Sequence, residues 1–281
     1  MAHWRSAGRR GRFVTGVPMF SGFMVNTWIV TSMVAVVAAV VGFFVVARGT
    51  AFAAHALPFS AFPGAAMAHV LGIDDFLGLG VFAALGVLTI AGLGRHARRD
   101  VATALCVMLL LGTGALFLSM TTEYSQEVYA LLFGQVLGVP SAALLPVSAL
   151  GAAAIAITLM LSRPLLLGVA STELVKASGV SPQLMELAFL AVLALATVAT
   201  LPVVGALLVF SLMVGPASAA RALASSPVFA VLLSVLFAVV TAWSSIILSY
   251  YSDWPMGFFV GAFAALWYMA SRLILDRGVR L

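Results

Sequence analysis

Side chains capable of chemistry are few in this sequence, and most of them lie between long apolar stretches. Paired carboxylates inside an apolar stretch, a glutamate–histidine metalloprotease motif and a glycine-rich phosphate loop with a lysine are all missing from it. The single lysine, Lys176, lies in a polar joint, and the single cysteine, Cys106, is typical of a small buried hydrophobe. We therefore predict that the chain is not an enzyme and binds no cofactor of its own.

His55 is the clearest exception, because it is an ionisable residue within an apolar stretch, residues 51–71. That stretch also contains Pro58 and Pro63, so we expect a bent or broken helix there. Irregular backbone at membrane depth is tolerated only beside protein or a watery cavity, and ionisable residues inside a membrane are functional by default. Two interpretations of His55 stay open: a ligand on a transport pathway, or a histidine that packs and hydrogen-bonds between spans. Met67 is a weaker candidate, either as a soft ligand or as ordinary packing.

The composition predicts an environment of lipid around most of the chain. The 281 residues are 63% hydrophobic and 8% charged, with a mean hydropathy of +1.18. A soluble domain carries about 25% charged residues, and the apolar runs are too long for barrel strands, so we predict an all-α integral membrane protein. The net charge of +5 comes mostly from arginines at the ends of apolar segments. This pattern suits an anionic inner leaflet and gives no case for nucleic acid as a partner.

Nine apolar segments predict eight or nine transmembrane helices, because a span needs about 20 mainly apolar residues. They lie near residues 27–47, 51–71, 76–94, 100–118, 142–161, 186–201, 203–220, 227–250 and 255–275. Residues 131–139 are too short to span and are expected to form a half-helix that dips into the membrane. We divide the chain into a basic amino-terminal tail (1–26), a transmembrane domain (27–275) and a carboxyl-terminal tail (276–281).

Basic joints predict the orientation in the membrane. Four of them can all face the cytoplasm, since an even number of crossings separates each pair. These joints carry Arg95, Arg98 and Arg99; Arg163 and Lys176; Arg221; and Arg272, Arg277 and Arg280. The same placement makes Arg48 cytoplasmic and puts Asp74, Asp75, Glu123, Glu127 and Asp253 outside. With nine spans the basic amino terminus would lie outside, against the rule, so its side stays open.

The longest inner joint, residues 162–185, is expected to contain a short helix parallel to the membrane. Ser171 is a plausible N-cap, Glu173 falls in the first turn, and Gly179 is a plausible stop. A surface helix between two spans is a natural contact for a cytosolic partner. The alternative is a connector with no partner.

Five sequence motifs, taken in order, carry a family resemblance that covers residues 27 to 275. They are residues 48–65 (RGTAFAAHALPFSAFPGA), 129–139 (YALLFGQVLGV), 177–180 (ASGV), 204–208 with 216–220 (VGALL and PASAA), and 248–251 with 253–257 (LSYY and DWPMG). Together they resemble the permease subunits of manganese, zinc and iron ABC importers, the ABC-3 family.

The resemblance implies a bacterial plasma-membrane permease with a type II ABC importer-like bundle and a cytoplasmic coupling helix. It implies a dimer with a second copy or a paralogue, an extracytoplasmic substrate-binding protein, and cytosolic ABC ATPase subunits that carry ATP and Mg. The ATPase contact would consist of Glu173, Leu174, Ala177 and Gly179 by position in the family.

One departure from the family bears on the cargo. Family members usually carry an aspartate and, four residues later, a histidine on the second span, and residues so spaced share one helix face and can hold a cation. Here His55 occupies the aspartate position and Phe59 the histidine position, with Ser60 next to it. Two His55 side chains in a dimer suit zinc or copper but lack the hard oxygens that manganese prefers. A metal chelate or a small organic molecule is the alternative cargo, for which an aromatic wall is reasonable.

A different class of transporter is the remaining rival. A secondary transporter driven by an ion gradient would normally place acidic residues inside its spans, and the sequence shows none there. We therefore expect importer activity by alternating access, with ATP hydrolysed on another subunit.

Overall fold

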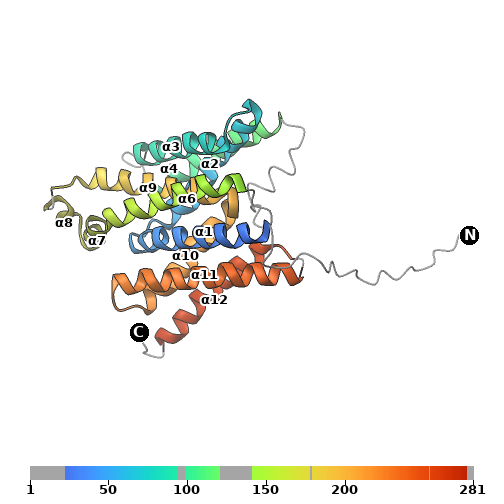
Figure 1. Cartoon of the computed structure of the whole chain (residues 1–281). Helices are drawn as coiled ribbons and strands as arrows, with labels where there is room; N and C mark the ends of the chain where they lie inside the picture. The colour runs from blue at the N-terminus through green and yellow to red at the C-terminus, as the bar shows by residue number, and fades with distance from the viewer. Residues whose placement is uncertain (1–22, 94–98, 121–140, 178, 253, 277–281) are drawn as a thin grey trace, which may run out of the picture.

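The computed structural model describes residues 23–93, 99–120, 141–177, 179–252 and 254–276, which form a bundle of α-helices (Figure 1). In chain order the helices are α1 Phe23–Ala47, α2 Ala51–Leu71, α3 Asp75–Leu93, α4 Arg99–Leu118, α6 Ser141–Met160, α7 Ser162–Ala170, α8 Thr172–Ala177, α9 Pro182–Val204, α10 Ala206–Leu223, α11 Pro227–Ser252 and α12 Met256–Asp276. The nine long helices coincide with the nine apolar segments to within four residues at either end. The prediction of an all-α membrane protein is confirmed.

Seven of these helices are long and apolar enough to cross a membrane: α1, α3, α6, α9, α10, α11 and α12. In α4 the apolar part is given by Thr103–Leu118, and the helix begins with Arg99 and Asp100. Helix α2 is outside the seven, and it contains two histidines and two prolines. The structure thus provides seven candidate spans, where the sequence analysis expected eight or nine.

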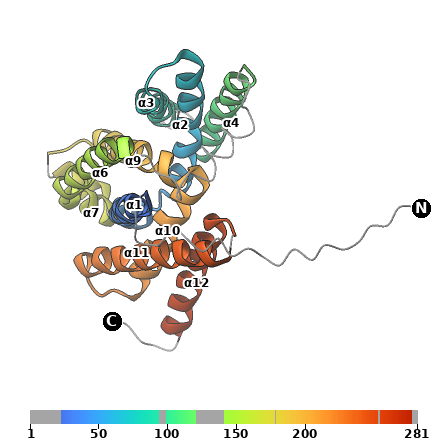
Figure 2. The same ribbon diagram turned by 45° about the vertical axis from the view of Figure 1, so that its right-hand side comes forward.

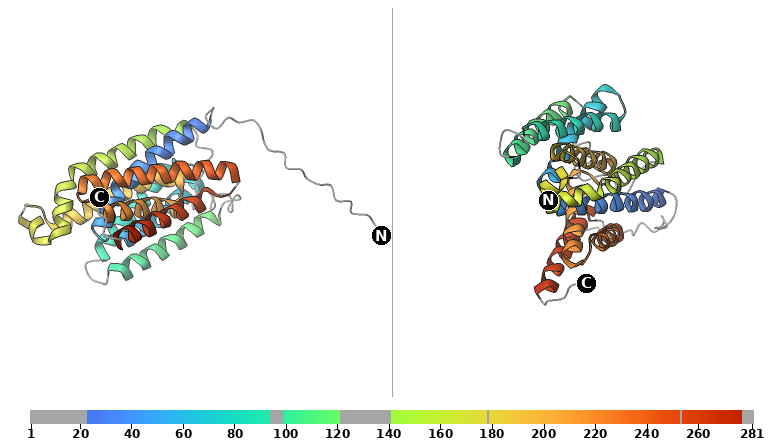
Figure 3. Two further views of the ribbon diagram at one scale, coloured as in Figure 1. Left: turned by 90° about the horizontal axis from the view of Figure 1, so that it is seen from below. Right: turned by 90° about the vertical axis from the view of Figure 1, so that its left-hand side faces the viewer.

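Helix α1 lies at the centre of the bundle. It contacts α6 and α9 on one side and α10 and α11 on the other. Seen after rotation, α2, α3 and α4 gather on one flank and α11 and α12 on the opposite flank, with α1 and α10 between them (Figure 2). The short helices α7 and α8 project beyond one end of the bundle (Figure 3, left), which we call the α8 end. Arg48 lies against Gly168 of α7 at this end, and Arg221 donates a hydrogen bond to the carbonyl oxygen of Val46 at the end of α1. The two joints therefore lie at the same end of the bundle, as predicted.

Of the bent or broken helix expected at Pro58 and Pro63, the structure excludes the break, since α2 is continuous from Ala51 to Leu71. A proline removes one backbone donor, but a helix enclosed by neighbours tolerates it. Helix α2 is enclosed in this way by α3, α4, α9 and α10. On the α4 side, a Cβ built onto Gly114 would lie 2.6 Å from the ring of Phe62 and 3.2 Å from Cα of Pro63. Close packing by neighbours therefore supports the helix where its own hydrogen bonding is interrupted.

Helices α2 and α3 approach each other through a pair of glycines. A Cβ on Gly64 would collide with the carbonyl oxygen of Gly78, and a Cβ on Gly78 would collide with that of Gly64. Small residues at such crossings let the two backbones come close together. Helices in lipid gain van der Waals packing energy in this way, because no hydrophobic force drives them together there. This contact fixes the side of α2 that faces α3.

Candidate transport pathway and coupling helix

His55 lies in the second turn of α2, on the face that meets α10. Its ring centroid is 5.0 Å from that of Phe59 on the same helix and 4.8 Å from that of Phe210 on α10. Interplanar angles of 68° and 69° make both contacts edge-to-face, the arrangement that aromatic rings prefer. All three side chains are half-buried. We call this group the His55 face.

The Nδ1 atom of His55 is buried and has no hydrogen-bond partner among the residues that the structure describes. Buried polar atoms in proteins are nearly always paired, because an unpaired one costs about 1–3 kcal/mol. The two phenyl rings beside it cannot accept or donate a conventional hydrogen bond. An imidazole nitrogen is also a ligand for borderline transition metals. The His55 face therefore presents one unsatisfied ligand atom in an aromatic setting.

The structure separates the four residues expected on the pathway. His55 and Phe59 come together, but Ser60 is fully buried on the opposite side of α2, next to Gly86 of α3. Its hydroxyl donates to the carbonyl oxygen of Ala56 at 3.0 Å, a bond within its own helix. Met67 is half-buried and lies 12 residues beyond His55, towards the far end of α2.

Phe210 is the member of the His55 face that the sequence analysis missed. It lies on α10, 155 positions away in the chain (210 minus 55), and its own segment shows only an apolar run. A single sequence contains no signal for such a long-range ring contact.

The described part of the chain contains no group of three or more His, Cys, Asp or Glu side chains that could hold a metal ion. A tightly bound structural metal such as zinc takes four ligands. Within these residues, His55 alone cannot make a permanent metal site.

Helix α8 confirms the short helix expected in the long joint. The Ser171 hydroxyl accepts a hydrogen bond from the backbone N–H of Leu174 at 3.2 Å, as an N-cap does. After the helix, Gly179 has φ +82°, a left-handed conformation that glycine adopts without strain. The preceding helix α7 was not foreseen. Pro164 near its start was the available signal, since proline is favoured in the first turn of a helix.

The four residues expected to contact an ATPase are all exposed: Glu173, Leu174, Ala177 and Gly179. Leu174 is a large apolar side chain on α8, and it is 46% exposed. Val175 points the other way and is only 2% exposed. Helix α8 therefore has one face against the protein and one face available to a partner.

Several expectations lie outside the described residues. These are the half-helix at residues 131–139, the motif at 129–139, the outer acidic residues Glu123, Glu127 and Asp253, and most of the arginines in the joints at 94–98 and 277–281. Asp74 is described, and its carboxylate accepts a hydrogen bond from Leu77 N at 3.2 Å. It caps the start of α3 in this structure.

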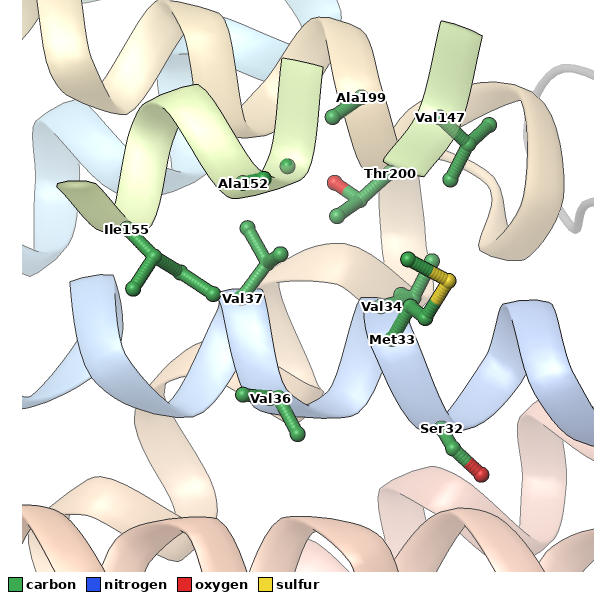
Figure 4. Close-up of a pocket in the computed structure, with 11 residues that line it drawn as sticks. Ser32, Met33, Val34, Val36, Val37, Val147, Ala152, Ile155, Ala199 and Thr200 are labelled. Carbon is green, nitrogen blue, oxygen red and sulfur yellow. The ribbon is translucent and has the colours of Figure 1, made fainter. Parts of the chain in front are cut away.

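An apolar cavity of about 280 Å³ lies apart from the His55 face. Its lining comes from α1, α6 and α9, with Val37, Val147 and Ile155 pointing into it (Figure 4). Thr200 and Ser32 supply the only hydroxyls among the residues that line it. None of the pathway or coupling residues expected from the sequence takes part.

The fold is that of a multi-pass helical membrane protein. The chain matches the model of the ABC 3 transport family over residues 21–274, and it belongs to that family as a non-catalytic, membrane-embedded permease subunit of an ABC transporter.

Named relatives match this chain in sequence over most of their length. The manganese import system permease protein ScaB of Streptococcus parasanguinis is 25% identical over 267 residues, which are 94% of this chain and 95% of the relative. The manganese transport system membrane protein MntC of Halalkalibacterium halodurans is 26% identical over 227 residues, 80% of this chain and 78% of the relative. A probable iron transport system membrane protein of Haemophilus influenzae is 26% identical over 242 residues, 85% of this chain and 89% of the relative.

Two solved structures share the fold. PsaBC from Streptococcus pneumoniae in complex with Fab superposes with a TM-score of 0.82 at 24% identity and covers 89% of this chain and 91% of its own. An inward-facing conformation of a putative metal-chelate type ABC transporter gives a TM-score of 0.69 at 16% identity, covering 90% of this chain and 87% of its own. The similarity to these structures extends across the whole bundle.

Proposed function

We propose that this chain is the permease of an ABC importer for divalent transition-metal ions. The observation that carries the proposal is the family match over residues 21–274 together with relatives named for manganese and iron transport. In this proposal α2 and α4 cross the membrane beside the seven candidate spans, which gives nine crossings. The α8 end faces the cytoplasm, where its arginines meet the anionic leaflet.

The cargo passes along the His55 face in this proposal. The unsatisfied Nδ1 of His55 offers one ligand bond, and a second permease copy across a two-fold axis would offer another. Two imidazoles and no carboxylate favour zinc, iron or copper over manganese, which prefers oxygen ligands. Weak, incomplete coordination is useful here, since a cargo that is held too tightly does not leave.

The energy comes from partner subunits. Cytosolic ATPases would dock on the exposed side of α8, at Leu174 and Glu173, and hydrolyse ATP with Mg. An extracytoplasmic binding protein would deliver the cargo at the opposite end of the bundle. Both partners are those that the resemblance to the ABC-3 family implies.

Uptake by cells that express the complete transporter tests the cargo. The variant His55→Ala removes the ligand nitrogen, and His69→Ala is the matched control, because His69 is exposed near the far end of α2. We expect accumulation of at least one metal among manganese, iron, zinc and copper to fall about tenfold or more in His55→Ala, the scale on which metal sites respond to altered ligation. The His69→Ala cells should match the wild type. Unchanged accumulation of all four metals in His55→Ala would remove the metal-ion proposal and leave the permease assignment intact.

A metal chelate or small organic molecule is the second candidate cargo, and the rings of Phe59 and Phe210 favour it. Aromatic side chains line pockets for organic ligands more often than pockets for bare ions. The variant Phe210→Ala distinguishes between the two candidate cargoes. Uptake of a chelate would fall with the loss of the ring, whereas uptake of a bare ion would persist because the His55 nitrogen remains.

A further inference from the structure

The end of α1 and the start of α2 are joined by a rigid elbow, residues 45–50. Gly49 N donates to Val46 O at 3.3 Å, and Thr50 N donates to Val45 O at 3.0 Å. With φ +69° at Gly49, this is a Schellman ending, in which two hydrogen bonds close the last turn of the helix. Ala54 N in turn donates to Thr50 O at 3.1 Å. A displacement of the elbow therefore moves the first turn of α2, and His55 lies directly after that turn.

Arg48 connects this elbow to two other helices. Its guanidinium carbon lies 5.1 Å from the ring centroid of Phe189 on α9, a cation–π contact. A Cβ built onto Gly168 of α7 would lie only 3.0 Å from Nη1 of Arg48, so the guanidinium also rests against α7. The planar, delocalised guanidinium can stack and pack in a way that a lysine ammonium cannot.

Gly168 is also the place where α8 meets α7. The same Cβ position lies 3.4 Å from Cγ2 of Val175, the buried side chain of α8. Arg48 and Val175 thus flank one glycine, with no side chain between them. Both atoms lie within 3.4 Å of the position that a Cβ on Gly168 would take, so pressure on the exposed side of α8 has a path through Val175 and α7 to Arg48.

The elbow has a second connection, to α10. Nη1 of Arg221 donates to the carbonyl oxygen of Val46 at 2.9 Å. Helix α10 also carries Phe210, whose ring contacts His55. Both helices of the His55 face are therefore attached to the same six-residue elbow, α2 through the chain and α10 through Arg221.

We infer that Arg48 is a positioning residue that transmits movement of the α7–α8 pair to the elbow, and so to the His55 face. This inference rests on the proposed docking of an ATPase at α8. Networks of packed side chains carry coupling of this kind when they link rigid elements, and a single residue in them changes the coupling by about 0.5–2 kcal/mol, or about 2- to 30-fold.

The experiment follows α2 directly and needs no knowledge of the cargo. The permease is reconstituted in nanodiscs with its ATPase, in a Cys106→Ser background, and an environment-sensitive fluorophore is placed at Phe52→Cys, an exposed position (44%) at the start of α2. We compare emission without nucleotide and after trapping with ATP and vanadate. We expect a spectral change in the parent protein and about a tenfold smaller one in Arg48→Ala. Arg48→Lys, which keeps the charge, should recover part of it.

Arg163→Ala is the matched control, since it removes the same charge from an exposed position on α7. It should respond like the parent, with the same melting temperature. A second variant, Gly168→Val, inserts a side chain between Arg48 and Val175 and tests the same path if Arg48→Ala fails to fold. The inference is overturned if Arg48→Ala, or Gly168→Val where Arg48→Ala does not fold, binds the ATPase and still gives the full spectral change.

Co-purification of the ATPase distinguishes the inference about Arg48 from the proposal that the ATPase docks on α8. Arg48→Ala should keep the ATPase on co-purification, because Arg48 lies behind α8, whereas Leu174→Asp should release it. If Leu174→Asp retains the ATPase, docking at α8 is wrong and the inference is overturned with it. If Leu174→Asp releases it and Arg48→Ala responds fully, only the role of Arg48 is overturned.

Discussion

The two faces of α2 are built in opposite ways. Towards α3, the backbones of Gly64 and Gly78 touch so closely that neither position has room for a methyl group, and Ser60 is fully buried and bonded to its own helix. Towards α10, His55 and Phe59 are half-buried, and a ligand nitrogen has no partner among the described residues. We call the tightly packed side of α2 towards α3, where the Ser60 hydroxyl is hydrogen-bonded, the closed face. We call the half-buried side towards α10, where His55 Nδ1 has no partner among the described residues, the open face.

The difference shows how a helix can hold a buried nitrogen without a partner, which costs free energy. An unpaired buried polar atom persists only where the surrounding structure over-determines its position. Here the glycine contact behind α2 and the continuous helix through Pro58 and Pro63 supply that rigidity. We expect substitutions on the closed face to change stability and substitutions on the open face to change transport.

The largest effect on stability is expected from Gly64→Ala. The added methyl meets backbone atoms of Gly78, which cannot move as a side chain can, so we expect destabilisation of about 3 kcal/mol, at the upper end for overpacked cores. Thermal melting in detergent measures it. Gly80→Ala on α3 is the control, because a Cβ there meets nothing within 4 Å. Equal melting temperatures for the two variants would show that the α2–α3 contact is looser than the structure has it.

His55→Phe sharpens the comparison on the open face. A phenyl ring keeps the edge-to-face packing with Phe59 and Phe210 but has no nitrogen, so stability should change by less than about 1.5 kcal/mol, as for shape-conserving swaps. Uptake of metal should fall about 10- to 100-fold, the range seen when the ligation of a metal is disturbed. Melting curves and metal accumulation are measured on the same preparation. A large drop in melting temperature with normal uptake would assign His55 to packing.

Ser60→Ala should have the smallest effect of the three. The lost hydroxyl is bonded to a carbonyl of its own helix, so stability should change by no more than about 1 kcal/mol and uptake should stay at the parent level. The same melting and uptake assays apply. A loss of uptake as large as that of His55→Phe would place Ser60 on the pathway and end the distinction between the two faces.

The sequence predicted the long helices and the short α8 well. Hydrophobic runs of span length are local signals, and they located all nine long helices to within four residues. The cap of α8 is local too, since Ser171 and the N–H of Leu174 are three residues apart. Signals of this kind do not depend on what the helix packs against.

Three features could not be predicted in the same way. The continuity of α2 depends on helices that enclose its prolines, and the ring of Phe210 reaches His55 from 155 positions away. Helix periodicity puts Ser60 and His55 on different sides of α2, but which of these sides meets α3 follows from the packing. Each is a consequence of helix placement, which no local pattern specifies.

By itself, the sequence determined that this is a membrane protein, where its long helices lie to within four residues, and that a capped helix lies between two of them. Only the tertiary structure decided which side of α2 is closed, which ring stands against His55, and that Arg48 and Val175 meet across Gly168. The reason is physical: backbone hydrogen bonds in lipid are satisfied within each helix and so follow from local sequence, whereas contacts between helices depend on steric fit between surfaces distant in the chain.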